Sequence, residues 1–91
     1  MIYSQETLKQ IEQLASLYMS VSDMAAILGL RAENLRRDIH VVGSPLFLAY
    51  HRGKAASKLE LRKQEMLLAK VGSPLALENC RRALIDMEDD E

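Results

Sequence analysis

Side chains that can form paired hydrogen bonds with nucleic-acid bases are concentrated in one short stretch of the chain. They are Arg31, Asn34, Arg36 and Arg37. An arginine can donate two hydrogen bonds to a guanine, and an asparagine can bond to an adenine in the same bidentate manner. These residue types therefore suit the recognition of base edges, provided that one helix presents them together in a DNA groove.

The residues that precede and include this stretch have the spacing of a helix-turn-helix. Ala25 is small enough to let a second helix approach closely, and Gly29, one helical turn later, can adopt the positive φ that ends a helix at a sharp corner. Ser22 is placed to cap the first helix of the pair. Apolar residues at helical spacing would join the two helices: Met24, Ile27, Leu28, Leu30, Leu35 and Ile39.

Two positions depart from the usual helix-turn-helix pattern. Arg31 stands where a serine or threonine commonly caps the second helix, and Asp38 stands where an apolar side chain is often found. The alternative interpretation is a compact three-helix bundle with a charged outer face, which Glu33 and Asp38 favour. We put DNA docking ahead of it, because arginine and asparagine suit direct base readout.

Charge is nearly balanced in total but uneven along the chain. The 91 residues carry a formal net charge of −1 and suit one small domain, with or without an extension. Basic residues dominate from Arg31 to Lys63, whereas acidic residues gather from Asp86 to Glu91, where we expect a solvated end. The basic middle is a candidate phosphate-facing surface. The predicted DNA-binding residues are Arg31, Asn34, Arg36, Arg37, His40, Arg52 and Lys54.

Periodicity and capping residues predict an all-α fold without strands. Apolar residues between Ser4 and Met19 recur on one helical face, so we expect a supporting helix capped by Ser4. The sequence Gly-Ser-Pro occurs at 43–45 and again at 72–74. Glycine can close one helix, serine can cap the next and proline suits its first position, which predicts helices from Pro45 to Val71 and from Pro74 to about Met87. We expect a three-helix unit over 1–43, followed by a helical hairpin over 44–91.

The long predicted helix has more apolar positions than one intramolecular partner requires. One seam could pack against the following helix of the hairpin, and the remainder favours another subunit. Ala49, Gly53 and Ala56 are small enough for backbones to pack closely, although Gly53 could equally weaken or kink the helix. We expect a homo-oligomer, and a fully intramolecular core is the alternative.

Other chemistry finds little support in the residue pattern. Cys80 is the only cysteine, which excludes an internal disulfide, and we expect it to pack rather than react. No ligand set suits zinc, no glycine-rich loop suits ATP, and no nucleophile, base and orienting residue can be assembled, so we expect neither a cofactor nor an enzyme. The stretch Met1–Glu6 lacks the features of a signal peptide, and no apolar run suits a membrane span. We expect a cytoplasmic protein.

The order of these motifs resembles the small terminase subunits of tailed phages and prophages. The resemblance is carried by Met24–Leu30 with Leu35-Arg36-Arg37, by Ala49–Ala55, and by Leu67–Lys70 running to Gly72-Ser73-Pro74. It implies a phage- or prophage-encoded subunit that recognises viral double-stranded DNA through its helix-turn-helix and assembles into a ring through its central helices. It also implies delivery of DNA to a separate large ATPase and nuclease subunit.

Two other functions remain open. A small phage or bacterial transcription regulator would most simply be a dimer that reads half-sites one helical turn apart. A helical adaptor would instead bind a partner protein, and it would be indifferent to changes at Arg36 and Arg37.

Overall fold

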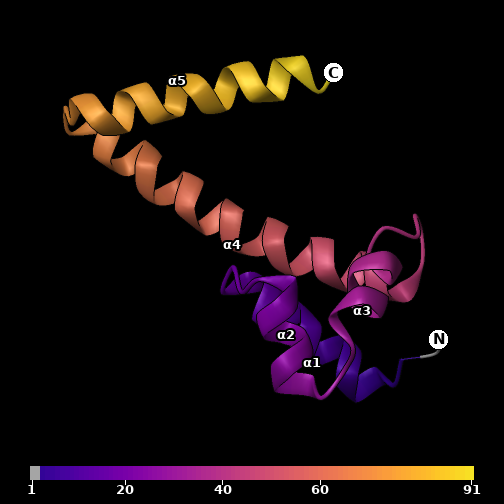
Figure 1. The fold of residues 1–91 in the computed structure, drawn as a ribbon. Coiled ribbons are helices and arrows are strands. Elements are labelled where there is room, and N and C mark those ends of the chain that lie inside the picture. The colour runs from indigo at the N-terminus through magenta and orange to yellow at the C-terminus, as the bar shows by residue number, and fades with distance from the viewer. Residues whose placement is uncertain (1–2) are drawn as a thin grey trace. The chain divides into compact units, whose positions relative to one another are not determined.

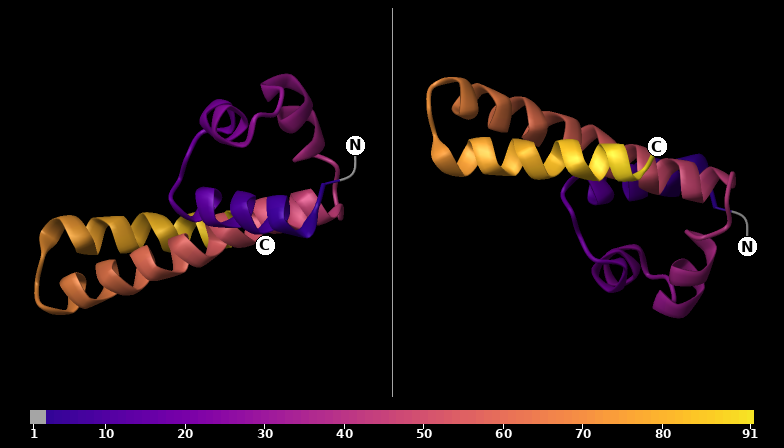
Figure 2. Two further views of the ribbon diagram at one scale, coloured as in Figure 1. Left: turned by 90° about the horizontal axis from the view of Figure 1, so that it is seen from below. Right: turned by 90° about the horizontal axis from the view of Figure 1, so that it is seen from above.

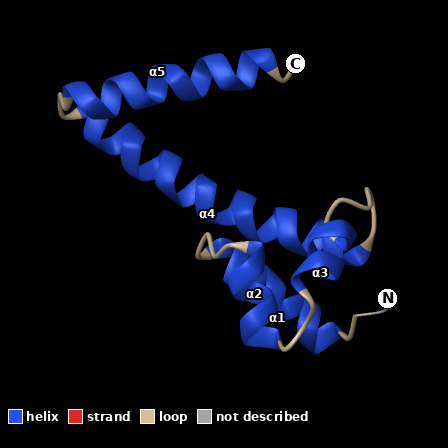
Figure 3. Ribbon diagram, in the orientation of Figure 1, coloured by secondary structure: helices blue, strands red, loops and turns tan. Residues whose placement is uncertain are grey.

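The computed structural model describes residues 3–91, and five helices account for most of them. They are α1 (Gln5–Ser16), α2 (Val21–Leu28), α3 (Ala32–Asp38), α4 (Pro45–Lys70) and α5 (Pro74–Asp89) (Figure 1). The described residues include no strand (Figure 3), so the expected all-α fold is confirmed. Met1 and Ile2, which belong to the stretch compared with a signal peptide, lie outside the described residues.

The chain divides into two compact units, Met1–Ser57 and Lys58–Glu91, and the division falls within α4. The sequence places it earlier, between residues 43 and 44. The start of α4 belongs with the first unit because Leu46, only 3% exposed, lies in the same hydrophobic cluster as the three preceding helices. The predicted three-helix unit is therefore completed by a fourth helix.

The core of the first unit is small and apolar. Its buried members are Ile11, Ala15, Met24, Ala25, Leu35, Ile39 and Leu46. The expected positions Met24, Leu35 and Ile39 are among them, and Leu28 and Leu30 pack against them while partly buried. Ile27 differs from expectation, since it is 59% exposed. The buried arc of α2 is centred on Met24, Ala25 and Leu28, and a residue at position 27 projects from its edge.

Most helix ends follow the predicted capping chemistry. Ser4 caps α1 by accepting a hydrogen bond from the backbone N–H of Thr7, and Gly29 closes α2 with φ of 71°. The expected cap Ser22 is wrong, because Ser20 caps α2 by accepting from the backbone N–H of Asp23 at 3.1 Å. The helix begins at Val21, so Ser22 already lies in its first turn.

The small residues of α4 serve a contact within the chain. A β-carbon at Gly53 would overlap the carbonyl oxygen of Glu12 and would lie 3.0 Å from the β-carbon of Ala15. Ala49 is also buried, at 6% exposure, whereas Ala56 is exposed. The expectation that these residues allow close packing between subunits is therefore wrong for Gly53, which allows α4 to cross α1 closely. The helix continues through Gly53 without interruption.

The second unit is a helical hairpin made of the end of α4 and all of α5, which run antiparallel (Figure 2). Ser73 caps α5 by accepting from the backbone N–H of Ala76 at 3.3 Å, and Ser44 caps α4 in the same way. In both Gly-Ser-Pro junctions the serine caps the following helix and the proline is its first residue, as predicted. Gly43 does not close the preceding helix, because α3 already ends at Asp38 with Ile39 as its C-cap. Helix α5 extends to Asp89, into the acidic end. Asn79 Nδ2 donates to Glu65 Oε1 at 3.3 Å, which links the two helices.

The hairpin has almost no hydrophobic core of its own. Ala76 is its one buried residue. Every leucine, isoleucine, valine and methionine from Lys58 to Glu91 is exposed, from 49% for Leu77 and Leu84 to 81% for Val71. Isolated two-helix hairpins of this size gain too little from burial to offset the entropy of ordering them.

Candidate nucleic-acid interface

The side of α3 that faces away from the core carries basic side chains. Leu35 and Ile39 point into the core, at 0% and 3% exposure. The opposite face is formed by positions one helical turn apart, and all four of its residues are exposed. We call this face, together with His40 in the turn that follows α3, the outer stripe: Glu33, Arg36, Arg37 and His40. The structure thus brings three of the predicted DNA-binding residues onto one surface.

Arg31 and Asn34 flank this stripe. Arg31 occupies the N-cap position of α3 without a side-chain capping hydrogen bond, and it is exposed. Asn34 is half-buried. The long side chain of Arg31 therefore extends from the start of the helix, the end that normally approaches base edges in helix-turn-helix complexes. Its exposure is consistent with a contact outside the chain.

Arg36 is tied to the preceding helix. Its Nη2 donates a hydrogen bond to Ser22 Oγ at 3.1 Å, and Ser22 lies in the first turn of α2. The sequence suggests Ser22 as a cap, but the structure gives its hydroxyl this other role. Because the guanidinium has five N–H donors, one such bond leaves most of its donors available.

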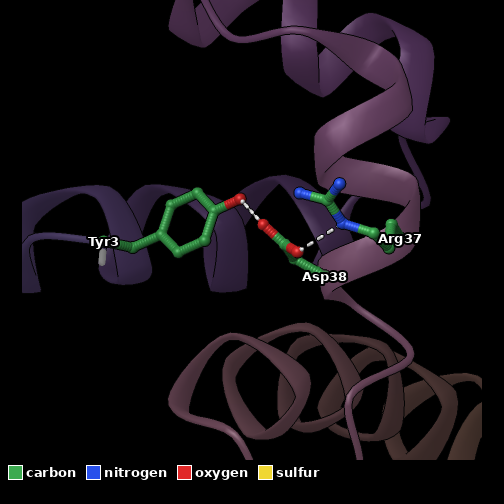
Figure 4. A network of polar contacts seen from close by, with 3 residues as sticks. All are labelled: Tyr3, Arg37 and Asp38. Atoms are coloured by element: carbon green, nitrogen blue, oxygen red, sulfur yellow. Dashed lines mark hydrogen bonds and ion pairs between the residues drawn. The ribbon is translucent and has the colours of Figure 1, made fainter. Parts of the chain in front are cut away.

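Arg37 belongs to a network that links the residue before the cap of α1 to the end of α3 (Figure 4). Its Nε donates to Asp38 Oδ1 at 3.1 Å, and the hydroxyl of Tyr3 donates to Asp38 Oδ2 at 2.6 Å. Asp38 is thus the acceptor of both bonds, one from its neighbour on α3 and one from the residue that precedes the cap of α1. This explains why the chain tolerates an acidic residue where an apolar one is common.

The network shifts the ionisation of two of its members in opposite directions. The hydrogen bond from Tyr3 holds the pKa of Asp38 below its usual value, with Arg37 acting in the same direction. Partial burial, reinforced by the hydrogen bond to Asp38, raises the pKa of Tyr3 to about 12. Near neutral pH the tyrosine therefore remains a donor and the aspartate remains a charged acceptor.

Sequence reasoning missed this network. Tyr3 and Asp38 are separated by 35 positions, and no local pattern connects them. The sequence signal that could have indicated it is Asp38, an acidic residue at a helix position that is commonly apolar. A half-buried carboxylate requires a hydrogen-bond partner.

Arg52 and Lys54 form a second group, on α4. Arg52 Nε lies 3.9 Å from Glu12 Oε1 on α1, so part of its charge is compensated within the chain. Lys54 Nζ lies 5.1 Å from the ring centroid of Tyr50, in a cation–π geometry. Both side chains are exposed, but their contacts are with α1 and α4 rather than with the outer stripe.

The described residues offer no second kind of site that matches known chemistry. Among residues 3–91, no three histidine, cysteine or acidic side chains are grouped so that they could hold a metal ion. Cys80 is a half-buried free thiol on α5. No helix in this part of the chain combines the length and apolar composition that crossing a bilayer requires.

Comparisons with known protein families, with curated proteins and with solved structures found no significant match to this chain.

Proposed function

We propose that the chain is a non-enzymatic protein that binds double-stranded DNA through α3 and associates with further copies of itself through residues 58–91. The observation that supports DNA binding best is the outer stripe. Arg36 and Arg37 on α3 and His40 just after it are exposed, while Leu35 and Ile39 are buried. A core-facing side with two apolar anchors and an outer side with two arginines is what a groove-binding helix requires.

In this proposal, α3 enters the major groove and its arginines contact base edges or phosphates. The segment from Arg31 to Asp38 carries three arginines and two acidic residues, Glu33 and Asp38. Its net charge is therefore positive and attracts DNA, although the whole chain has a formal net charge of −1. Arg36 and Arg37 are already held by Ser22 and Asp38. Side chains that are ordered before binding lose less conformational entropy when they bind.

Self-association is supported by the exposed apolar side chains of the hairpin. A second copy can cover them, and the charges of the two helices favour such pairing. From Lys58 to Lys70, α4 carries four basic residues: Lys58, Arg62, Lys63 and Lys70. In α5 the acidic residues predominate: Glu78, Asp86, Glu88 and Asp89. The end of α4 in one copy therefore complements α5 in the next, whether the assembly is a dimer or a ring.

The resemblance to small terminase subunits suggests the biological process in which this DNA binding and self-association would be used. The chain would be a phage- or prophage-encoded protein of the bacterial cytoplasm that recognises viral DNA for packaging and passes it to a large ATPase and nuclease subunit. A helix-turn-helix transcription regulator would bind DNA through the same helix, but a dimer would be enough to read paired half-sites. A helical adaptor would bind a partner protein through the same hairpin and would not bind DNA.

Light scattering on the full chain distinguishes these functions. The solution mass is measured at low and moderate salt, with and without a short DNA duplex, against the 10.3 kDa of one chain. A large oligomer that gains mass with DNA supports the packaging subunit, and a dimer that gains mass supports the regulator. If the mass does not change when DNA is added, DNA binding is contradicted and the helical adaptor is the remaining function.

A further inference from the structure

We propose that Tyr3 and Asp38 are positioning residues that orient the guanidinium of Arg37 for contact with DNA. This inference rests on the proposed function and assigns a role in DNA binding to a residue outside the helix-turn-helix. Tyr3 precedes α1, yet its hydroxyl reaches the last residue of α3. The inference therefore predicts that a change near the N-terminus alters how the recognition helix binds.

The argument starts from the way the carboxylate of Asp38 is used. One oxygen accepts from Tyr3 at 2.6 Å and the other accepts from Arg37 Nε at 3.1 Å. The Asp38 side chain is only 15% exposed, whereas that of Arg37 is 66% exposed. A carboxylate that is held at one oxygen by a half-buried tyrosine provides a fixed anchor for the exposed arginine.

The bond to Asp38 uses the Nε–H of Arg37 and leaves both terminal amino groups unbound by this carboxylate (Figure 4). Those two groups form one edge of the planar guanidinium, with donors that can bind a phosphate or the acceptors of a guanine. An arginine side chain that is hydrogen-bonded through Nε has fewer accessible rotamers than a free one. The anchor thus reduces the entropy that Arg37 loses on binding DNA.

A surface ion pair between neighbouring residues would not by itself carry this role, because such pairs are weak and mobile. The second bond makes the difference, since it connects Asp38 to a residue 35 positions away. Without the hydroxyl of Tyr3, Asp38 could rotate with Arg37 and the pair would no longer be fixed relative to α3.

The test is a double-mutant cycle on DNA affinity in the full chain. Tyr3→Phe removes the hydroxyl and leaves every charge near neutral pH unchanged. Tyr18→Phe, at an exposed tyrosine, is the matched control. We expect Tyr3→Phe to weaken duplex binding about fivefold, the effect of one net hydrogen bond, and Tyr18→Phe to leave it unchanged. We also expect Arg37→Ala to cost less in the Tyr3→Phe background than in the wild type.

Nuclear magnetic resonance of the DNA-free protein reports whether Tyr3 fixes the guanidinium of Arg37, and the double-mutant cycle reports whether this matters for DNA binding. The Nε–H of Arg37 should exchange slowly with water in the wild type and in Tyr18→Phe, and faster in Tyr3→Phe. Additive effects of Tyr3→Phe and Arg37→Ala on affinity, or unchanged Nε–H exchange, would overturn the positioning role while DNA binding stands. A wild-type protein that binds no duplex, with its Nε–H still protected, would overturn the proposed function and reduce the network to a structural link.

Discussion

Gly53 lies directly against the backbone of Glu12, so that a β-carbon at position 53 would overlap the Glu12 carbonyl oxygen. This contact sets how closely α4 crosses α1, and Leu46 at the start of α4 lies in the core of the first unit. The helix-turn-helix is therefore supported by a helix that also continues into the hairpin. Arg52, one residue earlier, pairs with Glu12 across the same crossing.

The substitution Gly53→Ala should destabilise the first unit. The added methyl group meets backbone atoms that cannot rotate away, and overpacking of this kind costs roughly 3 kcal/mol. This exceeds the roughly 1 kcal/mol that alanine contributes over glycine in a helix. Chemical denaturation followed by circular dichroism measures the difference in the free energy of unfolding.

Gly29→Ala is the matched control for this prediction. Position 29 has a φ of 71°, but nothing lies within 4 Å of a β-carbon built there. Gly29→Ala should therefore lower the free energy of unfolding only through backbone strain, by about 1 kcal/mol. If Gly53→Ala proved no less stable than Gly29→Ala, the close crossing of α1 and α4 would be wrong.

The contact between Tyr3 and Asp38 predicts stability that depends on pH at both extremes. The pKa of Asp38 is lowered in the folded protein, so its contribution is present above the unfolded value near 3.8 and is lost as the pH falls through the folded value. The pKa of Tyr3 is raised from 10.0 to about 12, so its contribution is complete below pH 10 and is lost as the pH rises towards 12.

The substitution Tyr3→Phe isolates both effects. Other groups titrate in the same ranges, so the informative quantity is the difference in unfolding free energy between the wild type and the variant, measured by denaturation at several pH values. We expect the wild type to be the more stable near neutral pH and the two proteins to converge in acid and above pH 10. A difference that is constant across pH would contradict the hydrogen bond.

The exposed apolar side chains of the hairpin predict that charge placed among them will break self-association. Leu68 and Leu84 are 51% and 49% exposed. In Leu68→Glu and Leu84→Glu, a carboxylate would have to be buried in the proposed contact between copies, which is strongly unfavourable. We expect the solution mass, measured by light scattering, to fall towards 10.3 kDa.

The control for this prediction is Leu17→Glu. Leu17 is 70% exposed and belongs to the first unit. The same change of charge at this position should leave the assembly unchanged. A hairpin variant with the wild-type mass would show that the exposed leucines of residues 58–91 lie outside the contact.

Local sequence signals predict the helices of this chain well, because capping depends on neighbouring residues. Ser4, Gly29 and the serines of both Gly-Ser-Pro junctions have the predicted roles, whereas Gly43 lies beyond the end of α3. Ser20 and Ser22 show the limit of such reasoning. Both are plausible caps two residues apart, and only the backbone angles of the folded chain assign the role to Ser20.

Features that depend on distant contacts are less accessible to sequence reasoning. In the sequence, Gly53 suggests a weakened helix, whereas the structure shows that it allows α1 to pack closely. Asp38 departs from the motif in the sequence, whereas the structure shows that it accepts a hydrogen bond from Tyr3. Within the candidate site, helical periodicity places Arg36 and Arg37 on the side of α3 away from Leu35, and His40 lies exposed in the turn after the helix. The internal partners of its arginines do not follow from periodicity.

DNA binding by α3 is tested most directly by comparing Arg36→Glu with Lys9→Glu. Both variants change the net charge equally, but Arg36 lies on the outer stripe and Lys9 is an exposed residue of α1. Duplex binding is measured by fluorescence anisotropy over a range of salt concentrations. We predict that Arg36→Glu weakens binding at least tenfold. It should also reduce the slope of log affinity against log salt concentration by about the amount expected for one lost phosphate contact. Lys9→Glu should have a small effect on both quantities. Equal effects of the two variants, or no binding by the wild type, would contradict recognition of DNA by this helix.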